Sequence, residues 1–100
     1  MELTSKQRAQ LRGIAAGEDT IIHIGKDGIT ENLIKQVNDA LEARELIKVN
    51  VQKNAPYMTA REACNELCER VHAEPVQCIG MRFSIYRQAR ENSKIKLEEL

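Results

Sequence analysis

The sequence predicts one compact α/β domain in which a mixed four-stranded sheet is packed with helices. Three observations support this fold class. Amphipathic helical patterns alternate with short apolar runs typical of strands, in the order helix, strand, helix, strand, helix, strand, strand. Strands joined by a helix are expected to pair in parallel, and the last two runs lie close enough to form a hairpin that adds an antiparallel edge. A length of 100 residues with 42% hydrophobic and 30% charged residues suits a single globular domain.

The first helix is expected at residues 4–16. Thr4 is a natural N-cap, and Gln7 stands where a capping box needs Glu or Gln. Apolar residues recur on one face, and Gly17 follows the pattern, as is typical of a helix end. Three basic residues with no acid between them lie in this segment: Lys6, Arg8 and Arg12. They form either a binding surface or an ordinary solvated face.

A strand at residues 20–24 runs into a turn that has a glycine at each end, Gly25 and Gly28. Thr30 is a natural N-cap for a second helix at residues 31–44. Because glycine has no Cβ, this turn would let a ligand approach the backbone closely. The helix start behind it presents unpaired N–H groups, which favour an anion such as a phosphate. The alternative interpretation is an ordinary tight turn.

Residues 46–52 alternate as a half-buried strand does, with isoleucine and valine on one face. The other face is expected to be wet or to meet a polar partner. It carries Lys48, Asn50 and Gln52. A third helix is expected at residues 59–72, because Thr59 is a natural N-cap and an apolar stripe follows it.

Pro75 is expected to close a linker that leads to a hairpin of two strands, at residues 76–79 and 83–87. Phe83 is expected in the core. Strand alternation directs Tyr86 to the opposite face, which allows a position at the surface.

Apolar residues become sparse after Gln88, so we place the domain at residues 1–88 and a charged tail at residues 89–100. The net charge is zero, with 15 basic and 15 acidic residues, but the charges are segregated. Between residues 82 and 96 a single acid, Glu91, accompanies a run of basic residues. These are Arg82, Arg87, Arg90, Lys94 and Lys96.

Composition excludes several classes of protein. No run approaches the ~18 apolar residues of a membrane span, and the first residues lack the apolar core of a signal peptide. We therefore expect a cytoplasmic protein without membrane contact. Three cysteines do not form a closed disulfide framework. Cys64, Cys68 and His72 could form part of a metal site, but buried apolar cysteines in a reducing cell are the favoured interpretation, with no metal or cofactor.

Known phosphate motifs and catalytic pairs are not evident. The glycine turn is not a P-loop, because no Gly-Lys-Ser/Thr follows it, and the first glycine of a dinucleotide fingerprint is missing. His23 lies in an apolar run and His72 near a helix end, and neither has an obvious nucleophile as partner. We therefore expect a protein that is not an enzyme and has no small-molecule substrate.

Ordered blocks of sequence cover residues 3–87. They are Leu3-Thr4, Lys6-Gln7-Arg8 and Leu11-Arg12; Gly25-Lys26-Asp27-Gly28-Ile29-Thr30; Ala40-Leu41 and Glu45-Leu46-Ile47-Lys48-Val49; Val76-Gln77-Cys78-Ile79-Gly80; and Tyr86-Arg87. In these blocks the chain resembles the CRM domain family, named for chloroplast RNA splicing and ribosome maturation, and in particular its stand-alone bacterial YhbY-type RNA-binding proteins. The resemblance implies a fold similar to the C-terminal domain of bacterial translation initiation factor three.

The resemblance also implies RNA binding through the Gly-x-x-Gly loop with basic residues nearby, on precursors of the large ribosomal subunit. Two positions depart from the family pattern. Asp27 puts an acid in the loop where members often have a neutral residue, and Met81 stands where relatives often have lysine. The residues expected to contact RNA are Gly25, Lys26, Asp27, Gly28, Lys6, Arg8, Arg12, Lys35, Arg82 and Arg87.

Aromatic residues make up 3% of the chain, so we expect recognition of the shape and backbone of structured RNA and not base stacking. The competing hypothesis is a protein-interaction module without direct RNA contact. The zero net charge favours it, and so does the run of acids in the third helix and after it. These acids are Glu62, Glu66, Glu69 and Glu74.

Overall fold

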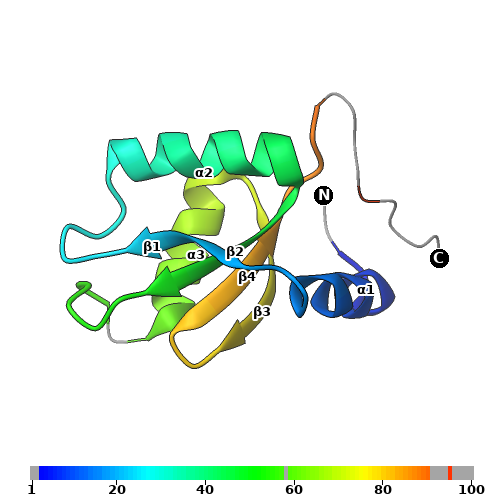
Figure 1. Ribbon diagram of the computed structural model, residues 1–100, viewed down its shortest axis with the longest axis horizontal. Helices are drawn as coiled ribbons and strands as arrows, with labels where there is room; N and C mark the ends of the chain where they lie inside the picture. Colours follow the sequence, from blue (N-terminus) through cyan, green and yellow to red (C-terminus); the bar gives the residue numbers. More distant parts are fainter. Residues whose placement is uncertain (1–2, 58, 91–94, 96–100) are drawn as a thin grey trace.

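The computed structural model describes residues 3–57, 59–90 and 95. The elements follow the predicted order, and Figure 1 shows them as a sheet with helices packed around it. They are α1 (Ser5–Ala15), β1 (Thr20–Ile24), α2 (Glu31–Arg44), β2 (Leu46–Val51), α3 (Ala60–Val71), β3 (Glu74–Ile79) and β4 (Arg82–Tyr86).

The predicted N-caps are confirmed. The side chains of Thr4, Thr30 and Thr59 each accept a hydrogen bond from the backbone N–H three residues later. At Thr4 the reciprocal bond from its backbone N–H to the Gln7 side chain completes the predicted capping box. Local sequence signals therefore define where all three helices begin.

The mixed four-stranded sheet has the order β1-β2-β4-β3. β1 and β2 are parallel, as expected for strands joined by a helix. The same expectation is wrong for β2 and β3, which are not neighbours: β4 lies between them and is antiparallel to both. β4 follows β3 through a tight turn, and it pairs with β3 on one side and with β2 on the other.

β3 begins two residues earlier than predicted and includes Pro75, which we expected in the linker. Proline is tolerated there because β3 is an edge strand, whose outer N–H groups need no partner in the sheet. The register shifts between Pro75 and Gln77, so Val76 is an additional residue in a β-bulge. Val76 packs against α1 residues, in the second of two apolar clusters.

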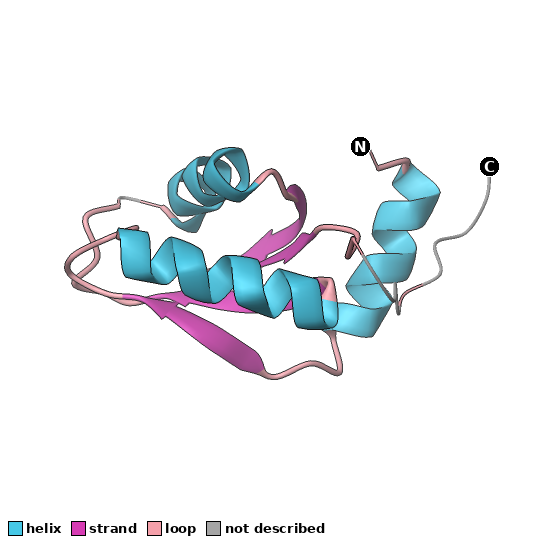
Figure 2. Cartoon of the chain, turned by 90° about the horizontal axis from the view of Figure 1, so that it is seen from above, coloured by secondary structure: helices cyan, strands magenta, loops and turns pink. Residues whose placement is uncertain are grey.

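The two clusters lie on opposite faces of the sheet. The larger one joins α2 and α3 to the sheet residues Ile47, Val49, Phe83 and Ile85, which confirms the prediction for Phe83. The smaller one joins Leu11 and Ala15 of α1 to Leu46, Val76 and Tyr86. Figure 2 shows α1 standing apart from α2 and α3 at one end of the sheet.

Tyr86 does not occupy the surface position that strand alternation allowed. It does point away from Phe83 and Ile85, but α1 covers that part of the face and leaves Tyr86 1% exposed. The sequence pattern defines which face a strand residue occupies. It does not show whether another element packs on that face.

A buried acid holds the residues that follow β4. Glu45, which caps the C-terminal end of α2, is 0% exposed. Its carboxylate oxygens accept hydrogen bonds from the N–H groups of Ala89 and Ile95, each at 2.8 Å. Ala89 is buried and Ile95 packs on the smaller cluster, so contacts cross the predicted boundary at residue 88. The predictions for Lys94, Lys96 and the last residues lie outside the described residues.

Candidate nucleic-acid interface

The Gly-x-x-Gly turn links the end of β1 to the start of α2. The N–H of Gly28 donates to the carbonyl oxygen of Gly25 at 3.0 Å, which closes the turn. Gly28 has a φ of +68°, in the left-handed region that favours glycine. A Cβ at Gly28 would lie 3.1 Å from Cγ of Pro56 and 3.3 Å from the hydroxyl oxygen of Tyr57. Gly28 therefore satisfies a packing requirement within the protein.

The loop after β2 packs against the glycine turn through Pro56 and Tyr57. The hydroxyl of Tyr57 donates to Oε2 of Glu66 on α3 at 2.8 Å, which fixes the ring against Gly28. Partial burial and this bond to Glu66 raise the pKa of Tyr57 above its ordinary value. The N–H of Gln52 donates to the carbonyl oxygen of Ile24. This bond links the loop after β2 to the end of β1, where the glycine turn begins.

Gly25 is different from Gly28. Its φ is not positive, and a Cβ there would meet only the amide of the exposed side chain of Gln52, at 3.0 Å from Oε1. The fold does not require glycine here.

Behind the turn, the hydroxyl of Thr30 accepts from the N–H of Leu33 at 3.1 Å. The N–H groups of Glu31 and Asn32 have no acceptor within the helix. The start of α2 therefore presents hydrogen-bond donors next to the glycine turn. Glu31 brings an acidic side chain to this end, but it forms an ion pair with Arg70 at 3.3 Å.

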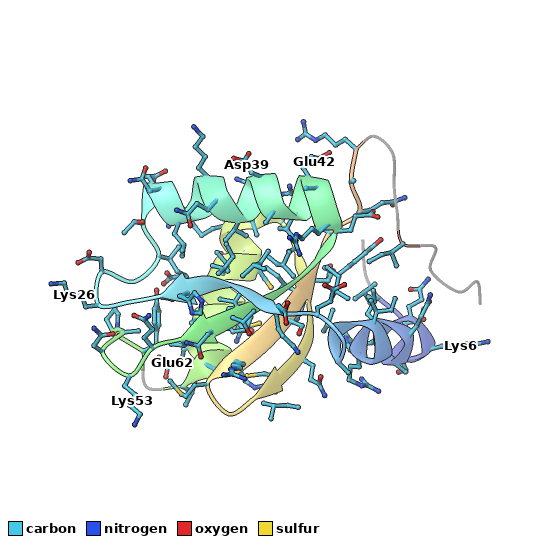
Figure 3. The ribbon with its side chains drawn as sticks, in the orientation of Figure 1. Lys6, Lys26, Asp39, Glu42, Lys53 and Glu62 are labelled. Atoms are coloured by element: carbon cyan, nitrogen blue, oxygen red, sulfur yellow. The ribbon has the colours of Figure 1, made fainter. Side chains whose placement is uncertain are left out.

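The turn borders a hollow of about 480 Å³ at one end of the molecule. Lys26 and Asp27 are both exposed on its rim. Figure 3 shows Lys26 and Lys53, from the two loops, at this same end. The other residues that line the hollow are His23, Gly25, Gly28, Thr30, Leu33, Gln52 and Asn54.

Sequence reasoning missed the contribution of the second loop, including Gln52 and Asn54. A signal was available. β1 and β2 are parallel neighbours, and the carboxyl ends of such strands meet at one edge of a sheet, so the loops that follow them lie together.

The basic residues predicted with the turn do not form one surface around it. Lys6 lies on α1 at the opposite end of the molecule from Lys26 (Figure 3). Lys35 is exposed on α2. Arg12 and Arg82 line a separate hollow between α1 and the sheet, together with Lys48. Figure 1 shows α1 and the β1–α2 loop at opposite ends of the sheet.

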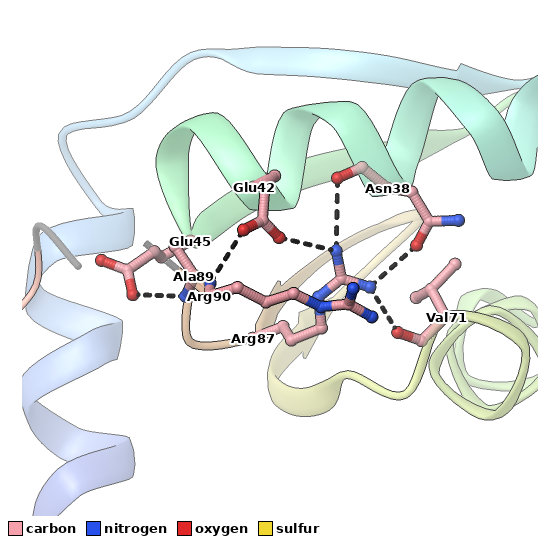
Figure 4. Close-up of polar contacts among 7 residues, drawn as sticks. All are labelled: Asn38, Glu42, Glu45, Val71, Arg87, Ala89 and Arg90. Carbon is pink, nitrogen blue, oxygen red and sulfur yellow. Dashed lines mark hydrogen bonds and ion pairs between the residues drawn. The ribbon is translucent and has the colours of Figure 1, made fainter. Parts of the chain in front are cut away.

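Two of the predicted arginines make contacts within the protein. Nε of Arg8 donates to the carbonyl oxygen of Pro75 at 3.1 Å, which links α1 to the edge strand. Nη1 of Arg87 donates to Oδ1 of Asn38 and to the carbonyl oxygen of Val71, both at 2.8 Å, and Nη2 lies 3.5 Å from Oε2 of Glu42. Figure 4 shows this guanidinium joining α2 to the end of α3. RNA contact by Arg87 stays a prediction beside this structural role.

The cysteines are free thiols. Cys64 and Cys68 are buried on α3 as expected, whereas Cys78 is partly exposed. A hydrogen bond with Cys64, together with burial, raises the pKa of Cys68 above its ordinary value, so this thiol stays protonated. Among the described residues no group of three His, Cys, Asp or Glu side chains could hold a metal ion.

The histidines are at the surface: His23 is exposed on β1, and His72 ends α3 in a left-handed conformation. None of the helices in the described part of the chain has the length and apolar character that a membrane span needs.

This geometry defines a small α/β domain with a Gly-x-x-Gly loop between the first strand and the second helix. The chain belongs to the CRS1/YhbY (CRM) domain family, whose sequence model matches residues 3–87. The family resemblance read from the sequence is thereby confirmed, and so is the fold class.

Relatives of this chain are named for RNA binding. It is 39% identical to "Probable RNA-binding protein YqeI" of Bacillus subtilis, over 95% of this chain and 98% of that protein. It is 34% identical to an "RNA-binding protein" of Haemophilus influenzae, over 95% and 94% of the two chains. The solution structure of SAV1595 from Staphylococcus aureus, described as a candidate RNA binding protein, matches with a TM-score of 0.80 and 46% identity, over 97% of this chain and 100% of that one.

Proposed function

We propose that this protein binds RNA without catalysing a reaction, and that the Gly-x-x-Gly end of the molecule holds the RNA backbone. The observation that carries the proposal is the pair of unequal glycines. Gly28 is required by the fold, but Gly25 is not. Gly25 is half-buried, and it lines the same hollow as the exposed Lys26 and Thr30, the N-cap of α2. The names of the relatives support RNA as the ligand.

Recognition of shape and backbone fits this surface better than base stacking. Phe83 and Tyr86 are buried, and Tyr57 is partly buried against the larger cluster, so no aromatic side chain among the described residues is fully exposed for stacking. Lysine and backbone N–H groups suit phosphate oxygens, which structured RNA presents along its grooves.

We extend the proposal to ribosomal RNA in precursors of the large ribosomal subunit, with a role in ribosome assembly in the cytoplasm. The family resemblance motivates this step. Crosslinking in cells, with the contacted nucleotides mapped, is the experiment that tests it. We expect most crosslinks in 23S-type precursor RNA, and crosslinks spread over messenger RNA would contradict a ribosomal role.

Charge substitutions within the loop test the proposed surface. Lys26→Gln removes a cation from the rim and is expected to weaken binding to a structured RNA about three- to tenfold. Asp27→Asn removes the neighbouring anion and is expected to strengthen binding by a similar factor. Both residues are exposed, so neither change should alter the thermal unfolding temperature by more than about 2 °C.

Fluorescence anisotropy with a labelled RNA hairpin measures both effects. Arg44→Gln is the matched control, since Arg44 is an exposed cation in the last turn of α2. Equal affinities for the Lys26 and Asp27 variants and the unmodified protein would remove the loop from the binding surface. If the unmodified protein binds no RNA at all, the function itself is wrong.

A protein-interaction module remains the second candidate, because the hairpin between β3 and β4 exposes two large apolar side chains. Ile79 is 66% exposed and Met81 38%. Affinity purification with and without nuclease distinguishes the two functions. Protein partners that remain after RNA is degraded favour the interaction module, and partners that disappear favour RNA binding.

A further inference from the structure

The sheet face that carries α1 is covered only in part. α1 packs over the row of residues that includes Leu46 of β2 and Tyr86 of β4. The next row toward the carboxyl end of β2 consists of Lys48, Ser84 and Gln77, in register across β2, β4 and β3. Lys48 and Gln77 are partly exposed, whereas Ser84 is 3% exposed. This row and the last turns of α1 border a hollow of about 470 Å³.

The hollow is lined by three cations from three different elements. Arg12 comes from α1, Lys48 from β2 and Arg82 from β4. Among the described residues its lining includes no aspartate or glutamate. In a chain of zero net charge, such a concentration of one sign of charge produces a local positive field.

These cations are available to a ligand. The guanidinium groups of Arg12 and Arg82 make no hydrogen bond or ion pair with any described residue, in contrast to Arg8 and Arg87. Nζ of Lys48 donates to the carbonyl oxygen of Glu18 at 3.1 Å. That bond uses one of the three donors of an ammonium group and orients the others.

The hollow is connected to the Gly-x-x-Gly end by a row of side chains that spans all four strands. His23, Asn50, Arg82 and Ile79 are in register across β1, β2, β4 and β3. His23 at one end of the row lines the hollow beside the glycine turn, whereas Arg82 and Ile79 line the hollow under α1. The exposed Ile79 gives the row an apolar end.

We infer that the hollow between α1 and the sheet is a second phosphate-binding site for the same RNA, with Arg12, Lys48 and Arg82 as its cations. The inference rests on the proposed function and deepens it. One RNA backbone runs from the glycine turn along the His23–Asn50–Arg82 row to α1. Arg12 and Arg82 thereby gain a common role, and Lys48, which was not predicted from the sequence, joins them.

Single substitutions to glutamine at Arg12, Lys48 and Arg82 test this inference, with Arg44→Gln as the matched control. Anisotropy of a labelled RNA hairpin is measured at several KCl concentrations. Each of the three substitutions is expected to weaken binding about three- to tenfold. Each is also expected to reduce the slope of log affinity against log salt by roughly one, which corresponds to the loss of one phosphate contact. The control is expected to change neither quantity.

The outcomes separate this inference from the proposed function. If the unmodified protein binds RNA and Lys26→Gln weakens binding, but Arg12→Gln and Arg82→Gln leave both affinity and salt slope unchanged, the second site is wrong and the function stands. If no RNA binds, both are wrong. Thermal unfolding accompanies each variant, because Lys48→Gln also loses the bond to Glu18. If that variant unfolds, Arg12→Gln and Arg82→Gln alone decide the result.

Discussion

Gly25 and Gly28 have different physical roles, although the sequence motif treats them alike. Gly28 combines a positive φ with a space that Pro56 and Tyr57 close. Gly25 has no positive φ, and a Cβ there would meet only the flexible side chain of Gln52. A motif defined by two glycines therefore includes one position where the fold needs glycine and one position where the packing alone does not require it.

Gly80 provides the comparison that isolates the contribution of packing at Gly28. Both residues have a positive φ, +68° and +59°, but a Cβ at Gly80 meets nothing within 4 Å. Gly80→Ala is expected to lower the free energy of unfolding by about 1–2 kcal/mol, the cost of a left-handed alanine. Gly28→Ala is expected to cost more, because Pro56 must also move. Denaturant unfolding measures both, and equal losses would show that the contact with Pro56 has no energetic effect.

At the scale of elements, Arg87 connects parts of the chain that are distant in sequence. It follows β4 directly, and its guanidinium bonds to Asn38 in the middle of α2 and to Val71 at the end of α3. The α2 and α3 helices pack on the same face of the sheet, and this arginine bridges them at their solvent side. Its side chain is 24% exposed, so the bonds are only partly screened by water.

Arg87→Ala is expected to lower the free energy of unfolding by about 2 kcal/mol, since charge-assisted hydrogen bonds are lost and the carbonyl oxygen of Val71 loses its donor. Arg90→Ala is the control. Its backbone N–H bonds to Glu42, but its side chain is exposed, so a change within about 0.5 kcal/mol is expected. Urea unfolding followed by circular dichroism measures the two values. Similar losses in both variants would contradict the bridging role.

The elements themselves were predictable because their signals are local. Threonine caps, helical periodicity and strand alternation depend on residues within a few positions of each other, and they located all three helices and all four strands. The errors concern relations across the chain. The central position of β4, the burial of Tyr86 under α1 and the contacts of Arg87 all depend on which element packs beside which.

The candidate site was predictable to the same extent. Lys26 lies within the glycine turn in the sequence, and the four turn residues line one hollow in the structure. The other basic residues lie elsewhere: Arg8 bonds to Pro75, and Arg12 on α1 lines a separate hollow with Arg82 on β4. The alternation predicted Lys48 on the polar face of a strand. Only the strand register, which sets Lys48 beside Ser84 and Gln77, shows that it lines the second hollow.

At the scale of the molecule, the smaller cluster unites both ends of the described chain. Leu3 and α1 come from one end, and Ile95 packs beside them from the other. Glu45, the C-cap of α2, is fully buried, and its carboxylate accepts hydrogen bonds from the N–H groups of Ala89 and Ile95. Burial and the nearby Glu45 carboxylate raise the pKa of Tyr86 above its ordinary value. The residues after β4 therefore contribute to the same core that holds α1.

Ending the chain after Gln88 tests whether the residues after β4 stabilise the fold. The shortened protein is expected to lose about 2 kcal/mol or more of unfolding free energy, because a buried carboxylate loses two hydrogen-bond donors. In a Glu45→Ala background the same truncation is expected to cost clearly less, since the acceptor is already gone. Denaturant unfolding of the four proteins in this cycle measures the coupling. Equal truncation costs in both backgrounds would show that Glu45 does not hold the tail. If truncation costs nothing in the unmodified protein, the domain ends at residue 88, as the sequence predicts.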